Sequence, residues 1–510
     1  MRNKYLLAGA AVIALVPEAW YAASAQDIRL EEIVVTARKR EENLMEVPLA
    51  ITAFSAVDIQ SRNMKELNDI SAFTPSFNFV NQQGGSGRND RSSNALTFRG
   101  LYLGNNVGLS AGGQLFIDGA PVIGAQTPSI SDVERIEVLK GPQSAYFGRS
   151  TFVGAINFVM REPSDEFKGR IGAEYSRFGS NDLSLSLEGP IVEDKFKARI
   201  SARHFHEGGQ YTNFADPQGK KFGERTTNSL SSSMVFTPTD NLKIKAFVNY
   251  FENADGPPAQ AALKGEYRIG IPDRQGNCRP LTPLPAGITP GSSASRGYYC
   301  GTLPSAGDLK KQNLISGDYQ INALLRQTLF NPPNPLWATF DPLFIEDNAH
   351  RRKAYQGDLR IDYDTGGGYT FSALSAYHYD KSSNMIDLNY RDAHDIPNPL
   401  YVSEAATPTR LPWRNLLLLS QARSKDWSQE LRLTSPQDQD LRWTFGFNYL
   451  YAHSPGGTVY GNLILGPFFT AAITKQWART PSVFGAVYYD FTEDLTLSAE
   501  ARYQWDKISQ

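Results

Sequence analysis

From about residue 164 onward, the chain is dominated by segments in which apolar and polar residues alternate strictly. Successive side chains of a strand point to opposite faces, so each segment has one face suited to lipid and one suited to water. Several segments approach the ~9–11 residues that cross a bilayer at a tilt, whereas strands of soluble sandwiches average ~5–6. The pattern predicts membrane-crossing strands, seen best at residues 183–187, 196–203, 242–249, 441–449 and 495–504.

The connections between these segments alternate between short and long. Short polar turns are predicted at residues 189–190, 238–240, 364–368, 436–440 and 492–494. Long connections are predicted at residues 206–226, 252–351, 380–425 and 453–475, always on the same side. This arrangement is typical of outer-membrane barrels, and it gives about eleven strands after Lys168.

A different pattern precedes residue 164. Residues 133–139 alternate as a strand, and Gly141-Pro142 stops it, because proline lacks an amide donor and glycine reaches unusual backbone angles. Gly148 and Gly154 break the next segment, and residues 155–160 return as an apolar strand. The stretch predicts a strand, a tight turn and a strand, and it contains no catalytic constellation.

The N-terminal half of this region contains several kinds of predicted segment. Residues 1–25 have a basic start, an apolar run and small residues before Gln26, which predicts a secretory signal peptide, with an anchor helix as the alternative. A strand is expected at residues 51–54. Ser55 and Asp58 have the spacing of a capping box for a short helix, and Asn63 and Glu66 repeat that spacing for a second. Residues 81–94 read as an exposed loop.

The composition and the motifs of the chain limit the classes of function that it can have. The net charge of −2 argues against a partner held by phosphate neutralisation, so no nucleic acid is expected. There is no His-Glu-x-x-His motif, phosphate-binding loop or nucleophile elbow, so we expect no enzyme activity and no cofactor. His204 and His206 share a strand face, but interface polarity is a better explanation than a metal site. Cys278 and Cys300 should pair in an exported protein, contributing ~3 kcal/mol.

The stretch from Asp132 to Asn157 closely resembles the plug domain of TonB-dependent outer-membrane receptors. The similarity rests on Asp-x-x-Arg-Ile-Glu-Val-Leu-Lys-Gly-Pro-Gln, followed by Gly148 and Gly-Ala-Ile-Asn. Tyr146-Phe147-Gly148 and Val153 depart from the family pattern. Two further motifs, Arg99-Gly100 and Asp118-Gly119, are similar to plug turns. The plug-motif residues that we carry over are Arg99, Gly100, Asp118, Gly119, Arg135, Glu137, Gly141, Pro142, Gly148, Gly154 and Asn157.

The resemblance extends to the segment Ile33, Val34, Val35, Thr36 and Ala37, which looks like the TonB box. An extended segment can offer its backbone to an exposed sheet edge of a partner. Arg135 and Glu137 could also be an ordinary paired strand surface. Arg88 and Arg91 are tentative binding residues for an anionic ligand, although loop charge or pairing inside the plug is the favoured explanation.

The implied fold is an α+β plug domain followed by a transmembrane antiparallel β-barrel. We expect a signal peptide at 1–25, a TonB-box segment at 26–42, a plug at 43–163 and the N-terminal part of the barrel at 164–510. Plugged transporters have about 22 strands, so about half a barrel is present and the chain resembles a C-terminally truncated or fragmentary receptor. Half a barrel leaves two open edges, so this chain alone should not insert stably.

The resemblance implies TonB-dependent import of a scarce bulky solute, with a ferric siderophore-type complex as the first candidate. Saccharides, vitamin B12 and aromatic or steroid compounds are alternatives. The implied partners are TonB with its inner-membrane energising complex, outer-membrane lipid and a small-molecule ligand such as a metal chelate. A passive porin or adhesin, and a soluble extracellular enzyme or binding protein, remain as other classes.

Overall fold

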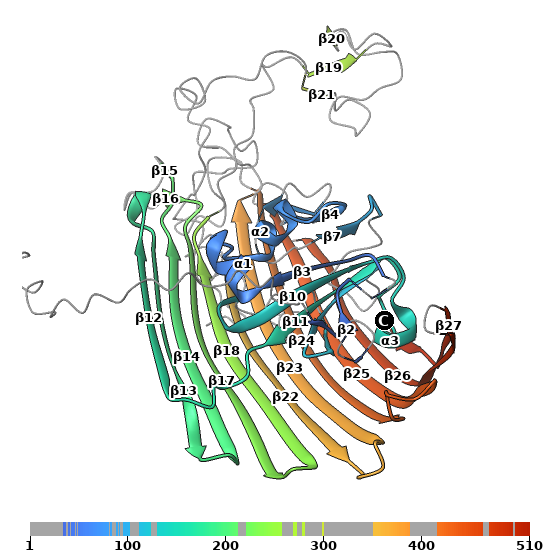
Figure 1. Ribbon diagram of the computed structural model, residues 1–510. Coiled ribbons are helices and arrows are strands. Elements are labelled where there is room, and N and C mark those ends of the chain that lie inside the picture. The colour runs from blue at the N-terminus through green and yellow to red at the C-terminus, as the bar shows by residue number, and fades with distance from the viewer. Residues whose placement is uncertain are drawn as a thin grey trace, which may run out of the picture.

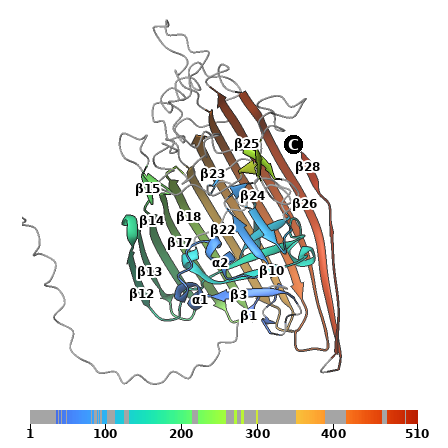
Figure 2. The same ribbon diagram turned by 90° about the horizontal axis from the view of Figure 1, so that it is seen from above.

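The computed structural model consists of a small globular unit lying against the concave face of a large curved sheet (Figure 1). A view turned by 90° shows the same arrangement, with the strands side by side and the globular unit against one face (Figure 2). The structure describes residues 34–36, 39–40, 42–45, 47, 49–80, 82–83, 88–89, 91, 95–101, 112–123, 130–212, 221–257, 269–272, 278–280, 298–299, 350–387, 416–462, 469–492 and 495–509.

Among these residues, a 12-stranded sheet follows the chain order, and β28 pairs with β26. Every pairing in it is antiparallel, which confirms the predicted barrel-type sheet of about eleven strands. Its strands are β12 (Lys168–Tyr175), β13 (Asn181–Val192), β14 (Phe196–Glu207), β17 (Arg225–Thr239), β18 (Leu242–Asp255), β22 (His350–Asp364), β23 (Thr370–Asp387), β24 (Leu416–Thr434), β25 (Leu441–Asn462), β26 (Phe469–Thr492), β27 (Leu495–Gln504) and β28 (Lys507–Ser509).

The alternation of the sequence becomes an inside-out pattern in this sheet. Ile200 is 50% exposed on the outer face, whereas its neighbour Arg199 is 5% exposed on the inner face. Val248 and Lys245 repeat the arrangement on β18, with 48% and 8% exposed. The apolar outer face fits lipid, and the polar inner face meets the globular unit.

Several strands are longer than the alternation predicts. The predicted loops at 380–425 and 453–475 are partly wrong, because β23 continues to Asp387, β24 begins at Leu416, and β25 and β26 reach 22 and 24 residues. The turn predicted at Gly189-Pro190 is also wrong, since β13 continues to Val192. Pro190 is tolerated in that strand because its pairing with β12 ends at Glu188, which leaves one edge free.

The other predicted turns agree with the strand ends. β17 ends at Thr239, β22 at Asp364, β24 at Thr434 and β26 at Thr492, each followed within a few residues by the next strand. The strand ends that the long connections join lie at the opposite end of the sheet. Small described elements on that side are β15 (Tyr211–Thr212), β16 (Lys221–Phe222), β19 (Ile269–Pro272), β20 (Cys278–Pro280) and β21 (Tyr298–Tyr299).

The globular unit, which we call the plug, contains a 5-stranded sheet in the order β3-β10-β11-β8-β9. The pair β11 and β8 is parallel, and the other pairs are antiparallel. The bounds of the plug strands are β1 (Val34–Val35), β2 (Glu42–Asn43), β3 (Ile51–Ser55), β4 (Phe77–Val80), β5 (Gln82–Gln83), β6 (Arg88–Asn89), β7 (Ala95–Phe98), β8 (Gly113–Ile117), β9 (Ala120–Val122), β10 (Val133–Lys140) and β11 (Gly154–Met160).

Short helices cover one side of this sheet. Helix α1 (Ala56–Ser61) has the predicted capping box of Ser55 and Asp58. Helix α2 (Leu67–Ala72) begins later than predicted, because Asp69 accepts the Glu66 amide, whereas Asn63 has a φ of +52° and lies outside the helix. Two short 3-10 turns lie at Ile130–Asp132 and Arg177–Gly179. In the described part of the chain, no helix is long and apolar enough to span a membrane.

The predicted strand, turn and strand of residues 132–163 are present, with one addition. The one-turn helix α3 (Ser144–Phe147) lies within the turn. Gly141 has a φ of +105°, a conformation that side chains disfavour. Gly154 allows close approach, because a Cβ there would lie 2.7 Å from the Leu139 carbonyl oxygen and from the Phe98 ring.

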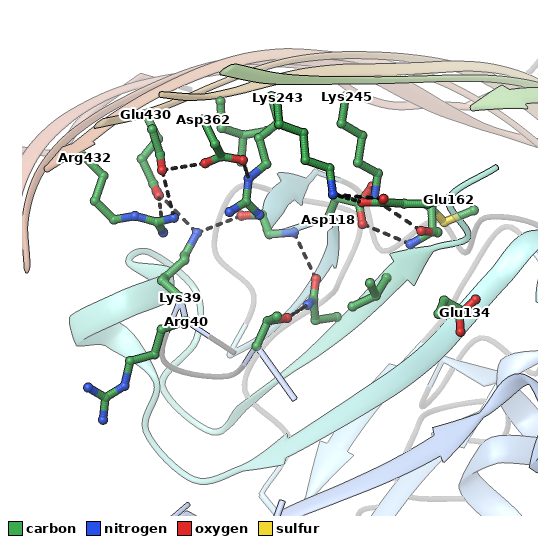
Figure 3. Close-up of a pocket in the computed structure, with 18 of the residues that line it drawn as sticks. Lys39, Arg40, Asp118, Glu134, Glu162, Lys243, Lys245, Asp362, Glu430 and Arg432 are labelled. Carbon is green, nitrogen blue, oxygen red and sulfur yellow. Dashed lines mark hydrogen bonds and ion pairs between the residues drawn. The ribbon is translucent and has the colours of Figure 1, made fainter. Parts of the chain in front are cut away.

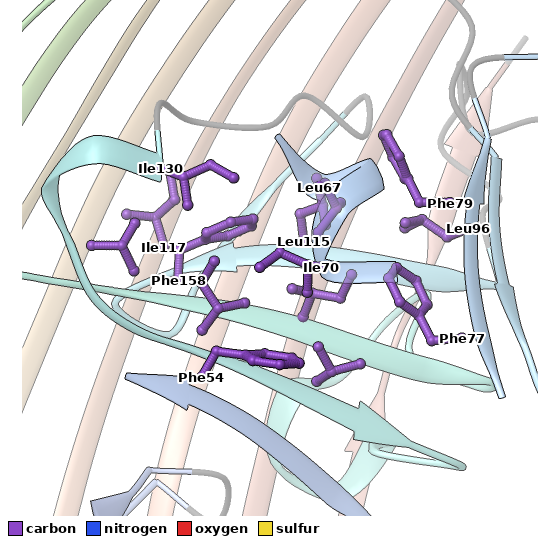
Figure 4. Close-up of a cluster of buried hydrophobic side chains, with 14 of the residues drawn as sticks. Phe54, Leu67, Ile70, Phe77, Phe79, Leu96, Leu115, Ile117, Ile130 and Phe158 are labelled. Carbon is purple, nitrogen blue, oxygen red and sulfur yellow. The ribbon is translucent and has the colours of Figure 1, made fainter. Parts of the chain in front are cut away.

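A hydrophobic core holds the plug together (Figure 4). It joins the helices to the sheet, since Leu67 and Ile70 of α2 pack with Phe158 of β11 and with residues of β3, β4 and β8. Phe247 of β18 is 1% exposed and belongs to the same cluster. The large sheet therefore contributes directly to the plug core.

Residues 1–510 expressed alone should fail to form a stable species in the outer membrane. Within the described residues, β12 and β27 are the edges of the large sheet, and their unpaired backbone groups would meet lipid. Heat-modifiable migration of membrane fractions on gels measures insertion, and a folded outer-membrane species would contradict this prediction.

Candidate functional site

The segment around Val35 is docked on the plug. Val34 and Val35 pair with Asn43 and Glu42, so the segment folds back on itself as a two-residue ladder. Val35 is fully buried, and Val34 is 37% exposed. Ile33 and Ala37, the outer residues of the predicted TonB box, lie outside the described residues.

The buried carboxylate of Glu137 holds the next residue of this segment. The Thr36 amide donates to Glu137 Oε1 at 2.8 Å, and the Thr36 hydroxyl donates to the same oxygen at 3.1 Å. Arg135 Nε also donates to Oε1 at 2.8 Å, and Asn157 Nδ2 donates to Oε2 at 3.2 Å. Glu137 is completely buried. We call Thr36, Arg135, Glu137 and Asn157 the docking cluster.

Strand pairing explains why these residues meet. Glu137 on β10 lies directly opposite Asn157 on β11, so their side chains share one face of the plug sheet. Asn157 Oδ1 in turn accepts the amide of Gly119 at 3.0 Å. The Asp118-Gly119 turn is fixed by a bond from the Met160 amide to Asp118 Oδ1 at 2.9 Å. Three plug motifs and the docked segment therefore converge on one place.

Two polar bridges connect this place to the large sheet. Lys39 Nζ lies 3.3 Å from Glu430 Oε2 on β24 and donates to the Gly119 carbonyl at 3.0 Å (Figure 3). Burial lowers the pKa of Lys39, and the charge of Glu430 partly opposes this effect. Asp118 Oδ2 lies 3.1 Å from Lys245 Nζ on β18.

A cavity of about 610 Å³ separates the docking cluster from the large sheet (Figure 3). Its walls mix both signs of charge, with Lys243, Lys245 and Arg432 from the sheet facing Glu134 and Glu162 from the plug. It lies toward the end of the strands that carries the short turns. The cavity suits water and mobile ions more than a single apolar ligand, and it borders the docked segment.

The remaining plug-motif residues lie at turns and close contacts of the fold. Arg99 has a φ of +50° and is exposed, and its guanidinium would lie 3.5 Å from a Cβ on Gly141. Gly100 has a φ of +77°, and Pro142 follows Gly141 at the end of β10. At Gly148, a Cβ would lie 2.7 Å from the Arg502 guanidinium carbon. None of these contacts involves the docked segment.

Arg91 is used in an ion-pair network between the plug and the large sheet. It bonds to Asp255 of β18 and lies 3.4 Å from Glu66, and Glu66 also pairs with Arg225 at 2.7 Å. Burial by itself lowers the pKa of Arg91, but the charge of Asp255 outweighs it and the pKa is raised. Arg88 lies in β6, and its side chain lies outside what the structure describes. A ligand-binding role of either arginine stays a prediction.

The structure describes the predicted cysteine pair and the two histidines only in part. Cys278 lies in β20, but Cys300 and the predicted Cys278–Cys300 pairing fall outside the described residues. His204 Nδ1 lies 2.7 Å from Asn228 Oδ1, and His206 Nδ1 lies 3.0 Å from Thr226 Oγ1. In the described part of the chain, no group of three or more His, Cys, Asp or Glu residues could hold a metal.

Sequence reasoning missed the partners of the plug on the large sheet. Asp132 pairs with Arg199 at 3.0 Å and also contacts Ser201 and Ser231. Tyr146 contacts Tyr488 through their hydroxyl groups. The partners are separated by 67 to 342 residues, so no local pattern could have paired them.

The linker from the plug to β12 should loosen in acid. Burial alone raises the pKa of Glu162, but the hydrogen bond and charge of Lys243, 2.9 Å away, outweigh it and lower the pKa below 4.5. A hydrogen bond from Lys197 likewise lowers the pKa of Asp165. Both contacts are complete above the ordinary carboxyl pKa and are lost as the pH falls through the lowered values. Below pH 4, the backbone amides of residues 161–167 should therefore be less protected from hydrogen exchange than at neutral pH, after correction for intrinsic exchange rates.

The matched control is the double variant Glu162→Gln/Asp165→Asn, which removes both titrating groups. Its corrected exchange should be independent of pH across this range. A wild-type linker whose protection is unchanged between neutral pH and pH below 4 would contradict the assignment.

The fold and the site define a class of protein. In it, a small plug domain with a docked N-terminal segment lies against the inner face of an antiparallel sheet whose outer face is apolar. Residues 43–155 match the family described as TonB-dependent Receptor Plug Domain. The chain is 25% identical over 256 residues to the Iron-regulated outer membrane virulence protein of Vibrio cholerae, covering 46% of this chain and 36% of that protein. It is 31% identical over 177 residues to the Vitamin B12 transporter BtuB of Vibrio vulnificus, covering 33% and 27%.

The fold is similar to that of the ferripyoverdine receptor of Pseudomonas aeruginosa, with a TM-score of 0.63 at 13% identity. That comparison covers 93% of this chain and 54% of the receptor, and it bears on the fold alone. The chain belongs to the TonB-dependent outer-membrane receptors, with their plug domain and part of their barrel. Its place is the bacterial outer membrane. The matches span about a third of the first relative's length and about half of the solved receptor.

Proposed function

We propose that the protein containing this chain imports a scarce, bulky solute across the outer membrane, using energy delivered by TonB. The observation that carries the proposal is the hydrogen bonding of Thr36 to Glu137 on the plug strand β10, next to the buried Val35. A partner that captures this segment by strand addition would pull on Glu137, and through it on the centre of the plug sheet. No catalytic chemistry is required of the plug.

The mechanism follows from the position of the docking cluster. Glu137 and Asn157 lie on two adjacent interior strands of the plug sheet, β10 and β11. Removing Thr36 breaks the hydrogen bonds that its amide and hydroxyl donate to Glu137 and leaves the carboxylate beside the charged cavity. Water can then enter at the cavity, where the ion pairs Lys39–Glu430 and Asp118–Lys245 join plug and sheet. The plug would shift along this polar interface and open a path.

The first candidate cargo is a ferric siderophore-type complex. The solved receptor with a similar fold was bound to ferripyoverdine, whereas one sequence relative is a vitamin B12 transporter. A non-iron solute therefore remains the second candidate. The cargo would enter from the end of the strands with the long connections, where Arg91 and its network join plug and sheet.

An uncoupler experiment separates this proposal from a passive porin or adhesin. Cells producing the complete protein are given a radiolabelled ferric siderophore with and without a protonophore. Uptake should fall to the level of cells lacking the protein, while binding to the cell surface is retained. Uptake that continues unchanged with the protonophore would favour a passive pore and overturn the proposal. Labelled vitamin B12 serves as the second cargo.

A further inference from the structure

The large sheet lines the cavity of about 610 Å³ with more basic than acidic side chains (Figure 3). Its basic side chains there are Lys243, Lys245, Arg360 and Arg432, and its acidic ones are Asp362 and Glu430. We call the four basic residues the basic wall. Lys245 on β18 lies directly opposite Arg360 on β22, and like charges in such a cross-strand pair repel each other. The wall is therefore stable only when carboxylates lie close to it.

Carboxylates of the plug neutralise the two lysines of the basic wall. Glu162 Oε2 lies 2.9 Å from Lys243 Nζ, and Asp118 Oδ2 lies 3.1 Å from Lys245 Nζ (Figure 3). Lys245 is 8% exposed and also donates to the Met160 carbonyl of the plug at 3.2 Å. In the described part of the chain, each ion pair of these two lysines is made with a residue of the plug.

Strand β14 repeats this arrangement. Arg199 Nη2 lies 3.0 Å from Asp132 Oδ1 of the plug, and Lys197 Nζ lies 2.8 Å from Asp165 Oδ1 in the linker that follows the plug. In these pairs the sheet supplies the base, and the plug or its linker supplies the carboxylate. Lys39 of the docked segment forms the reverse kind of pair, in which the sheet supplies the carboxylate. On β14 and β18, the plug thus covers basic groups of the sheet with its own carboxylates.

The docked segment borders the same cavity through Lys39. A pull on this segment would draw the Asp118-Gly119 turn away from β18, because Lys39 Nζ donates to the Gly119 carbonyl at 3.0 Å. Lys245 would then lose its carboxylate partner. A lumen with low-dielectric walls focuses the field of such groups and raises the local concentration of anions. Arg432 supplies a further donor, since its Nε is buried and has no hydrogen-bond partner among the described residues.

We propose that the basic wall is a transient binding track for anionic groups of the transported solute. In the docked state the plug carboxylates occupy the track, and carboxylate or phenolate oxygens of the solute take their place when the plug shifts. Lysine and arginine side chains bind such oxygens through charge-assisted hydrogen bonds. The inference rests on the proposed function and narrows the cargo to an anionic solute, such as a negatively charged metal chelate. An uncharged solute gains nothing from this wall.

The test uses the complete membrane-inserted protein that contains this chain, in a planar lipid bilayer. Urea is added at a concentration that unfolds the plug and leaves the barrel heat-modifiable, and a potassium chloride gradient is applied. The reversal potential gives the permeability ratio of chloride to potassium. Lys243→Gln/Lys245→Gln should lower this ratio about fivefold, because a unit charge about 4 Å from a passing ion in water contributes about 1 kcal/mol. Lys243→Arg/Lys245→Arg should keep the wild-type ratio.

The matched control is Asp118→Asn/Glu162→Gln, which breaks the same two ion pairs from the plug side and leaves the basic wall intact. Its permeability ratio should stay at or above the wild-type value. A ratio that is equal in wild type and Lys243→Gln/Lys245→Gln, or that falls equally in both double variants, would overturn the inference, because the lysines would then serve only to hold the plug. This measurement needs no TonB, so its failure is distinct from protonophore-resistant uptake, which overturns the proposed function.

Discussion

Replacing Val35 by proline should abolish energised uptake and leave ligand binding at the cell surface intact. Val35 lies opposite Glu42 in the β1–β2 ladder, and proline removes the backbone donor that any strand-adding partner would use. The outer end of the protein, where the cargo would bind, is formed by other residues. Uptake of labelled cargo and binding to de-energised cells are the two measurements, and only uptake should fall to background.

The control for this substitution is Val35→Ala. Alanine keeps the amide and loses most of the buried side chain, so it separates backbone pairing from burial. Uptake should persist in Val35→Ala at a reduced level. Full uptake by Val35→Pro would show that this segment does not transmit energy, even if the plug and barrel are correctly assigned.

The second large effect is expected at Glu137. The variant Glu137→Gln removes the negative charge that Arg135 and Thr36 share, while it keeps the size of the side chain. A hydrogen bond to a charged acceptor contributes about 1.4 kcal/mol more than one to a neutral acceptor, so weakening the bonds from the Thr36 amide and hydroxyl costs about 3 kcal/mol in total. The docked segment should then open roughly a hundredfold more often, since a tenfold change corresponds to about 1.4 kcal/mol. Trypsin cleavage after Lys39 and Arg40, followed by mass spectrometry, measures this opening.

Glu134→Gln provides a matched control on the same strand. Glu134 is an exposed carboxylate whose ion-pair distance to Arg161 is 3.3 Å, with 52% of its side chain exposed. Such surface pairs contribute ~0–1 kcal/mol, so the cleavage rate should stay near that of wild type. If Glu137→Gln is cleaved no faster than Glu134→Gln, the docking cluster does not hold the segment.

The plug illustrates how far local sequence reasoning reaches. The strand, turn and strand of residues 132–163 follow from alternation and from Gly141-Pro142, because backbone preferences act over neighbouring residues. Ser55 and Asp58 likewise predicted helix α1. The second helix was placed one turn too early, since both Asn63 and Glu66 have side chains that can cap, and only the packed structure selects between them.

The docking site was predicted only as separate motifs. Glu137 and Asn157 are recognisable in sequence, but Thr36 lies 101 residues before Glu137 and has no local signal for a partner. The segment was expected as a free extended strand, whereas Val35 is buried and Thr36 is hydrogen-bonded. An extended segment has unsatisfied backbone groups, so it binds to the nearest available partners when the fold supplies them.

The amino-acid sequence by itself determined the two kinds of structure, the plug motifs and the lipid-facing alternation, because both depend on spacing along the chain. The tertiary structure decided where the strands of the large sheet end and which polar groups of plug and sheet meet. Those features depend on cross-strand register and on contacts between distant residues. Neither is encoded in any short stretch of the sequence.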